Sequence, residues 1–271
     1  MNLIQVDRTK CVKCGLCAAV CPRGIIQVQQ EWPTTIDEEY CIACGQCGAV
    51  CPHAALDNIR APLAQQTPLM GTLVIDKAQA SQFLRSRRSI RHFQEKKIDK
   101  QQMLQLLDIA RFAPSGGNSQ GISYLVLQQP QILQRISAVT VDWMEENIRQ
   151  GAEWAKRYDA YVNSYRRTGK DVILRNAPCI IVAIAPDNFA RGRENAIFSL
   201  AYVELYAPSL GLGTCWAGFA EACAFAGYKP LLDLMEVPAG YKVMGVIMAG
   251  YPRYRYCRLT DRNPLHVEFR E

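Results

Sequence analysis

The chain has 271 residues, of which 49% are hydrophobic and 21% charged, so it can bury a sizeable core within one large domain or two ordinary ones. Its formal net charge of +6 comes from scattered basic residues, without the basic stripe and interleaved aromatics of a nucleic-acid-binding surface. The start, MNLIQVDRTK, has no apolar signal region, and no run of 18 apolar residues predicts a membrane span. Twelve cysteines without a secretion signal indicate metal sites rather than disulfides. We therefore expect a cytoplasmic protein that binds neither nucleic acid nor membrane.

The first 60 residues contain an internal repeat. CVKCGLCAAVCP (11–22) returns as CIACGQCGAVCP (41–52), with a constant offset of 30 residues. After each run, a short apolar stretch (24–28 and 54–59) predicts a turn followed by a strand. The repeat therefore predicts a small duplicated domain. At this size the hydrophobic core alone gives marginal stability, and a bound metal adds to it. The cysteines that it aligns are Cys11, Cys14, Cys17 and Cys21 with Cys41, Cys44, Cys47 and Cys51.

The spacing of these cysteines favours iron–sulfur clusters. Three thiols at positions i, i+3 and i+6 can turn inward around one cubane, and Gly15, Gly45 and Gly48 let backbone amides approach its sulfides. Zinc sites and spare thiols are the alternatives, but zinc motifs use paired C-x2-C with longer gaps. Clusters of purely structural role are another alternative. A duplicated arrangement, with two clusters near each other, favours electron transfer.

The pattern C-x2-C-x2-C-x3-C-P, present twice, resembles the two-cluster bacterial ferredoxins. The resemblance implies two 4Fe-4S clusters that exchange their fourth ligands. One cluster would be held by Cys11, Cys14, Cys17 and Cys51, and the other by Cys41, Cys44, Cys47 and Cys21.

Residues 61–75 predict a linker, because this stretch is rich in proline and low in charge, and residues 76–271 a second domain. In that domain, residues 99–112 have a helical period that Asp99 can cap and Pro114 ends. Buried strands are predicted at 122–127, 179–185 and 243–250. Residues 142–175 predict helices, interpreted either as a lid over a cofactor or as ordinary packing. The apolar helix 194–206, which Pro208 must end or kink, suits an interior or a dimer face.

Four short stretches of the second domain carry candidate chemistry. RSRRSIRHF (85–93) gathers arginines and a serine that can hold a phosphate. The loop APSGGNSQ (113–120) is rich in small residues that allow close approach to a planar ring. GLGTCWAGF (211–219) brings a glycine turn to a tryptophan, and GYPRYRYCR (250–258) is basic and follows a strand.

In this order, over about residues 80–265, the four stretches resemble the nitroreductase-like flavoprotein family. The resemblance implies an α+β fold overall: a small duplicated ferredoxin domain, then an FMN-binding α/β domain with a central, mostly antiparallel sheet flanked by helices. It also implies a homodimer with FMN at the interface. The FMN contacts that it implies are Arg87, Arg88, Ser89 and Arg91 at the phosphate, ribityl chain and pyrimidine edge; Ser115, Asn118 and Gln120 at the isoalloxazine from the partner subunit; Trp216, Ala217 and Gly218 beside N5 through backbone amides; and Arg255 or Arg258 at the phosphate.

Together the two resemblances predict an FMN-dependent oxidoreductase fed by two 4Fe-4S clusters, which reduces a small electron-poor, nitro-type substrate by hydride transfer from flavin N5. No catalytic side chain is assigned, because the cofactor does the chemistry. An external ferredoxin or NAD(P)H is the expected donor, although no G-x-G-x-x-G follows a strand. Reduction of an activated alkene, dehalogenation, and a non-enzymatic electron-transfer module are the alternatives.

Overall fold

The computed structural model describes residues 2–28, 32–69, 71 and 75–270, which form two compact units. The first unit comprises residues 1–74 with 116–119, and the second comprises residues 75–115 with 120–271. Residues 70 and 72–74, within the predicted linker, lie outside the described residues. Each unit is described by itself.

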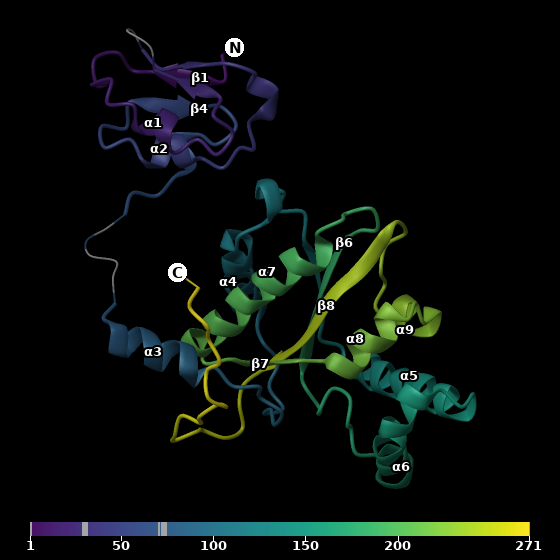
Figure 1. Ribbon diagram of the computed structural model, residues 1–271. Helices are drawn as coiled ribbons and strands as arrows, with labels where there is room; N and C mark the ends of the chain where they lie inside the picture. The colour runs from purple at the N-terminus through teal and green to yellow at the C-terminus, as the bar shows by residue number, and fades with distance from the viewer. Residues whose placement is uncertain (1, 29–31, 70, 72–74, 271) are drawn as a thin grey trace. The chain divides into compact units, whose positions relative to one another are not determined.

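The first unit is built from two short antiparallel strand pairs and two one-turn helices (Figure 1). Strand β1 (Ile4–Val6) pairs with β4 (Leu56–Asn58), and β2 (Ile26–Gln27) pairs with β3 (Thr34–Thr35). Helix α1 (Leu16–Ala19) and helix α2 (Gln46–Ala49) each begin inside a cysteine run. The unit also contains the 3-10 helices η1 (Glu38–Tyr40) and η2 (Leu63–Gln65). The small core includes Leu3, Ile4, Ile25, Ile26 and Leu56.

The sequence repeat is also a repeat of backbone conformation. Gly15 and Gly45, which precede α1 and α2, are left-handed with φ of 79° and 72°. Lys13 and Ala43, at equivalent positions, are left-handed too, with φ of 58° and 53°. These turns curl each C-x2-C-x2-C loop, and the left-handed φ of both glycines shows why a residue without Cβ stands there.

The second unit has a four-stranded sheet in the order β5-β6-β8-β7, in which every neighbouring pair is antiparallel. Its strands are β5 (Ser123–Leu127), β6 (Cys179–Pro186), β7 (Gly213–Trp216) and β8 (Tyr241–Gly250). The α+β class and the antiparallel sheet predicted from the sequence are therefore confirmed. The predicted strands at 122–127, 179–185 and 243–250 correspond to β5, β6 and β8.

Helices cover both faces of this sheet (Figure 1). On one face, α4 (Lys100–Asp108) and α7 (Gly192–Tyr206) pack on Ile181 and Ile247. On the other face, α5 (Pro130–Arg149) and α8 (Gly218–Phe225) pack on Val182 and Val246. Because successive strand residues point to opposite faces, β6 and the part of β8 from Val243 onward are apolar on both sides and mostly buried between two helical layers.

Local signals set the helix ends. The Asp99 carboxylate accepts a hydrogen bond from the Gln102 N–H at 2.9 Å, as an N-cap does, and α4 gives way to the 3-10 helix η3 (Ile109–Phe112). Helix α7 ends at Tyr206, and Pro208 falls in the 3-10 helix η6 (Ala207–Leu210), in agreement with the expected end. The remaining elements are α3 (Lys77–Ser86), η4 (Gly116–Asn118), η5 (Glu153–Tyr158), α6 (Asp159–Thr168) and α9 (Lys229–Leu234).

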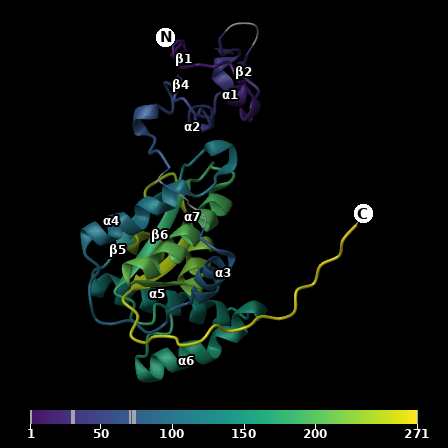
Figure 2. The same ribbon diagram turned by 90° about the vertical axis from the view of Figure 1, so that its left-hand side faces the viewer.

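Two isolated bridges lie outside the named strands, one at β7 and one just after β8. Ser89 forms a parallel bridge with Thr214, where the Ile90 N–H donates to the Thr214 carbonyl oxygen at 2.8 Å. Phe93 forms an antiparallel bridge with Pro252, just after β8. Beyond this bridge the chain continues as an exposed coil to residue 270 (Figure 2). In the described part of the chain, none of the helices combines the length and apolarity needed to cross a bilayer.

The packing of α7 on the sheet predicts a large difference between two leucine truncations. Leu200 in α7 is fully buried against Gly245, so Leu200→Ala should lower the free energy of unfolding by about 2–5 kcal/mol. Leu104 in α4 is 58% exposed, and Leu104→Ala should cost less than about 0.5 kcal/mol. Urea unfolding followed by circular dichroism measures both values; equal losses would contradict the assignment of α7 to the core.

Candidate cluster and flavin sites

Two cavities of the first unit are each lined by four cysteines of the repeat. One cavity is lined by Cys11, Cys14, Cys17 and Cys51, and the other by Cys21, Cys41, Cys44 and Cys47. Each set takes its fourth member from the other half of the repeat, which is the exchange that the ferredoxin resemblance implies. The assignment of these eight thiols as iron ligands remains a prediction, and the geometry supports it.

Hydrogen-bond donors point at some of these sulfurs. The Ala55 N–H donates to Cys51 Sγ at 3.3 Å, and the Asn58 side-chain amide lies 3.7 Å from both Cys41 Sγ and Cys47 Sγ. Donors placed in this way stabilise thiolates. Among the described residues, no three His, Cys, Asp or Glu side chains lie close enough to hold a single metal ion.

A cavity of the second unit, called the large cavity below, has a volume of about 710 Å³. It brings together Arg91 from the RSRRSIRHF stretch with Cys215, Trp216 and Gly218 from β7 and the start of α8. Met248, which is paired with Cys215 across β7 and β8, forms part of its floor. Two of the four predicted flavin-binding stretches thus meet at one cavity, although more than a hundred residues separate them.

The other basic residues of the predicted phosphate site, unlike Arg91, do not line the large cavity. Arg87 is paired with Glu204 at 3.6 Å. Arg88 donates through Nη1 to the Thr260 hydroxyl at 2.6 Å and lies over the Tyr256 ring. Arg255 and Arg258 are exposed in the C-terminal coil. The coil therefore lies against the arginine stretch, and the Arg87, Arg88, Ser89, Arg255 and Arg258 contacts with FMN stay predictions.

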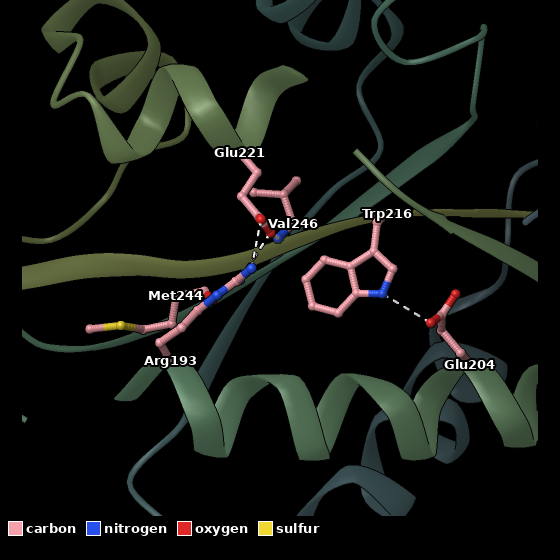
Figure 3. A network of polar contacts seen from close by, with 6 residues as sticks. All are labelled: Arg193, Glu204, Trp216, Glu221, Met244 and Val246. Atoms are coloured by element: carbon pink, nitrogen blue, oxygen red, sulfur yellow. Dashed lines mark hydrogen bonds and ion pairs between the residues drawn. The ribbon is translucent and has the colours of Figure 1, made fainter. Parts of the chain in front are cut away.

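Two buried carboxylates fix Trp216 at the cavity wall (Figure 3). Its indole N–H donates to Glu204 Oε2 at 3.0 Å, and Glu204 is only 7% exposed. The Arg193 guanidinium lies 5.3 Å from the centre of the Trp216 ring. Arg193 is itself held by both oxygens of Glu221 and by the Met244 carbonyl oxygen. Glu204 and Arg193 are themselves hydrogen-bonded to residues of the sheet, Thr214 and Met244. Their contacts therefore restrict the orientation of the Trp216 indole.

The backbone amides beside Trp216 are not equivalent. The Ala217 N–H donates to the Val246 carbonyl oxygen at 2.9 Å, so within this structure it is already used by the sheet. The contact of Ala217 with FMN stays a prediction. Gly218 is the first residue of α8, where backbone N–H groups have no partner within the helix. The N–H of Gly218 is therefore not used by the helix, in contrast to the Ala217 N–H that the sheet uses.

The predicted residues of the 113–120 loop lie elsewhere. Ser115 and Gln120 line a separate cavity of about 370 Å³ in the second unit, and the Gln120 N–H donates to the Ser115 hydroxyl at 3.1 Å. Asn118, with a φ of 55°, belongs to residues 116–119, which are grouped with the first unit. Within one subunit, then, Ser115 and Gln120 do not line the cavity of Arg91 and Trp216.

Sequence reasoning missed two arginines of the large cavity, Arg157 and Arg175. Both come from the segment that was interpreted either as a lid or as packing. Arg175 and the following Asn176 have left-handed φ values of 57° and 55°, a conformation that costs about 1 kcal/mol or more per residue. A lone arginine ahead of a predicted strand carries no motif, so only the fold reveals it.

The cysteines outside the repeat have the character of core thiols. Burial raises the pKa of Cys179 and of Cys223 to about 12. Burial also raises the pKa of Cys215, with Arg91 opposing the shift. These three side chains stay protonated near neutral pH, as expected of small buried residues of the core.

Comparison with known proteins settles the family. Residues 84–251 match the Nitroreductase family, and residues 10–55 match the 4Fe-4S dicluster domain. The chain belongs to the nitroreductase family. It is a nitroreductase-family oxidoreductase that carries a 4Fe-4S dicluster domain at its N-terminal side, as the sequence motifs predicted.

Several members of the nitroreductase family resemble the second unit. An iodotyrosine deiodinase of Thermotoga neapolitana is 20% identical over 171 residues, which are 62% of this chain and 86% of the relative. A 5,6-dimethylbenzimidazole synthase of Rhodospirillum rubrum is 25% identical over 174 residues, 62% of this chain and 79% of the relative. The crystal structure of a nitroreductase with bound FMN from Desulfitobacterium hafniense superposes with a TM-score of 0.56, at 18% identity, covering 72% of this chain and all of the other. These likenesses establish the nitroreductase fold, and the relatives differ in reaction.

The exchanged ligand sets predict which cysteine substitutions resemble each other. Cys51→Ser should remove the same cluster as Cys14→Ser, and Cys21→Ser the same cluster as Cys44→Ser, because each pair lines one cavity. Electron paramagnetic resonance of the reduced variants, with iron and sulfide analysis, measures which signal is lost. If Cys51→Ser instead reproduced the spectrum of Cys44→Ser, the exchange would be wrong.

Proposed function

We propose that the chain is an FMN-dependent oxidoreductase that receives electrons through two 4Fe-4S clusters and reduces a small electron-poor substrate of nitro type. The observation that carries this proposal is the cavity at which Arg91, Trp216 and Gly218 converge, in a chain that also carries a 4Fe-4S dicluster domain. When bound, the clusters carry single electrons, and FMN supplies hydride transfer from its N5.

The residues around the cavity suit FMN. Arg91 carries a fixed positive charge to the cavity, where it can face the pyrimidine edge. The Gly218 N–H, at the positive end of α8, favours an acceptor or a developing negative charge. Trp216, locked by Glu204 and Arg193, limits the position of a flat ring. Arg87, Arg88 and Ser89 are proposed to hold the phosphate, with Arg255 or Arg258.

The chain's own side chains bind and orient rather than react. Among the residues that line the cavity, Tyr158 and Tyr161 carry hydroxyl groups that can supply a proton to a reduced product. Aromatic contacts of Phe219 with Tyr158 and Tyr161, at ring-centre distances of 5.5 Å and 4.9 Å, form a wall against which a planar substrate can stack.

A second candidate reaction is reductive dehalogenation or reduction of an activated alkene at the same cavity. Dehalogenation is favoured by the similarity to the iodotyrosine deiodinase of Thermotoga neapolitana. A panel of one nitroaromatic, one haloaromatic and one activated alkene, offered to the reduced protein, separates these reactions. A non-enzymatic electron-transfer module predicts turnover of none of them.

A homodimer is part of the proposal. Helix α7 exposes Ile197, Phe198 and Tyr202, to 39%, 47% and 38%, on the side away from its buried stripe. An apolar helix face of this kind suits an interface between copies, as the family resemblance implies. In a dimer, Ser115 and Gln120 of one subunit would approach the FMN of the other. Sedimentation analysis of the holoprotein measures the oligomeric state.

The electron route gives a direct test. A Cys14→Ser/Cys44→Ser variant, which removes one cysteine from each cavity, should retain FMN but lose turnover with reduced ferredoxin as the donor, because single electrons no longer reach the flavin. The same variant, with its flavin reduced photochemically, should still reduce the substrate at the wild-type rate.

The reference measurements are flavin, iron and sulfide content after anaerobic reconstitution, and flavin reduction by ferredoxin against NAD(P)H. The matched control is Cys257→Ser, because Cys257 is an exposed cysteine outside the repeat. It should leave the rates of flavin reduction by ferredoxin and by NAD(P)H unchanged. Protein that binds no flavin at all, or a double variant that turns over normally with ferredoxin, would disprove the proposal.

A further inference from the structure

Three arginines line the large cavity of the second unit: Arg91, Arg157 and Arg175. Only Arg91 belongs to a flavin-binding stretch, and the other two follow from no motif. Among the described residues, no Asp or Glu lines this cavity. Two cationic side chains are therefore available there beyond those assigned to the cofactor.

The position of Arg175 is built into the fold. The Asp171 carboxylate accepts hydrogen bonds from the backbone N–H groups of Ile173, Leu174 and Asn176, at 2.9–3.0 Å, and from the Ser137 hydroxyl of α5 at 2.9 Å. Ile173 and Leu174 are buried in the core, so the turn is fixed from both sides. A turn held in this way keeps Arg175 at the cavity in spite of its left-handed backbone.

The surroundings of Arg157 and Arg175 suit an aromatic anion. Arg157 lies over the Tyr158 ring and donates to its hydroxyl at 3.1 Å. Tyr161 and Phe219 offer ring faces on the same cavity. An arginine fork binds carboxylate or phosphate oxygens through charge-assisted hydrogen bonds, which a neutral substituent cannot form with equal strength.

We propose that the substrate of this cavity is an electron-poor aromatic compound that carries an anionic group, a carboxylate or a phosphate, and that Arg175 with Arg157 binds that group. This inference rests on the proposed function, because it names the substrate class of the same site. Arg175 is then the residue that determines specificity for charge, and the aromatic wall holds the reducible ring.

The test uses the FMN-loaded and cluster-loaded full chain with matched charged and neutral ligands. Equilibrium binding of benzoate and benzamide, read from the flavin absorbance, should favour benzoate. Arg175→Gln should weaken benzoate binding about tenfold, as loss of one charge-assisted hydrogen bond predicts, and leave benzamide unchanged. Arg175→Lys should retain part of the preference, and Arg135→Gln, an exposed arginine of α5, should have no effect.

Single-turnover reoxidation of the reduced flavin by 4-nitrobenzoate, 4-nitrobenzamide and 4-nitrophenyl phosphate gives the second readout, and it distinguishes carboxylate from phosphate. Equal affinity of the wild type for benzoate and benzamide would overturn the inference. Loss of FMN from Arg175→Gln would also overturn it, because Arg175 would then be a cofactor residue. If none of the three nitro compounds reoxidises the flavin while the benzoate preference and its Arg175 dependence remain, the proposed reaction fails and the anion site stands.

An independent observation concerns Asn58 in the first unit. Asn58 is 3% exposed, and its side-chain amide nitrogen lies 3.7 Å from Cys41 Sγ and from Cys47 Sγ. The orientation of the amide is determined by its other end, since Asn58 Oδ1 accepts the Arg60 N–H at 2.9 Å. The NH₂ group must therefore face the sulfurs.

The two halves of the repeat differ at this point. Thirty residues before Asn58 stands Val28, which packs against the small core and has no polar side-chain atom. Hydrogen bonds to cluster sulfurs stabilise the more negative, reduced state and raise the reduction potential. We infer that Asn58 raises the potential of the cluster held by Cys41, Cys44, Cys47 and Cys21, so that this cluster accepts an electron before the other.

A redox titration of the reconstituted full chain, followed by electron paramagnetic resonance, tests this assignment. Asn58→Val, which copies the other half of the repeat, should lower the potential of one cluster alone and bring the two potentials together. Asn58→Leu keeps the shape of asparagine without its donor and should have the same effect if the valine variant assembles poorly. Unchanged potentials in a variant with full iron content, or an equal shift of both, would overturn the role of Asn58.

Discussion

Burial of β8 on both faces is the constraint on which the large cavity depends. The strand lies between β6 and β7, and its residues Val246 to Gly250 are buried between two helical layers. A one-residue slip of β7 against β8 would exchange the two faces of β7. The cavity needs Cys215 opposite Met248, and Gly218 after the end of β7. The apolar sequence of the sheet therefore fixes the place of the polar groups around it.

Features set by neighbouring residues could be predicted from the sequence. The cysteine runs, the Asp99 cap and the end of α7 before Pro208 each depend on residues within one or two turns of chain. Strand β6 and residues 243–250 of β8 were predictable because a strand covered on both sides has a continuous apolar run. The convergence of Arg91 with Trp216 was accessible only through resemblance, since nothing in either stretch specifies the bridge between Ser89 and Thr214.

Features set by distant contacts could not be predicted. The hydrogen bond from the Ala217 N–H to the Val246 carbonyl oxygen follows from the sheet register. The position of Arg175 at the cavity follows from the Asp171 carboxylate, which is four residues earlier and accepts a hydrogen bond from Ser137 of α5. Asn58 looks like an ordinary strand residue until β4 places it beside Cys41 and Cys47. In each case the residue type is uninformative, and its neighbours in space decide its chemistry.

Glu204 joins two of the stretches that the sequence presented as separate. Its carboxylate lies 3.6 Å from Arg87 of the arginine stretch and accepts hydrogen bonds from Thr214 and from the Trp216 indole at 3.3 and 3.0 Å. A carboxylate this buried gains little net stability from its ion pair, because desolvation offsets the attraction. Its benefit lies in geometry: the arginine stretch and the tryptophan cannot move independently while one buried group holds both. The carboxylate on α7 thus sets the relative position of the two stretches that the proposed flavin requires together.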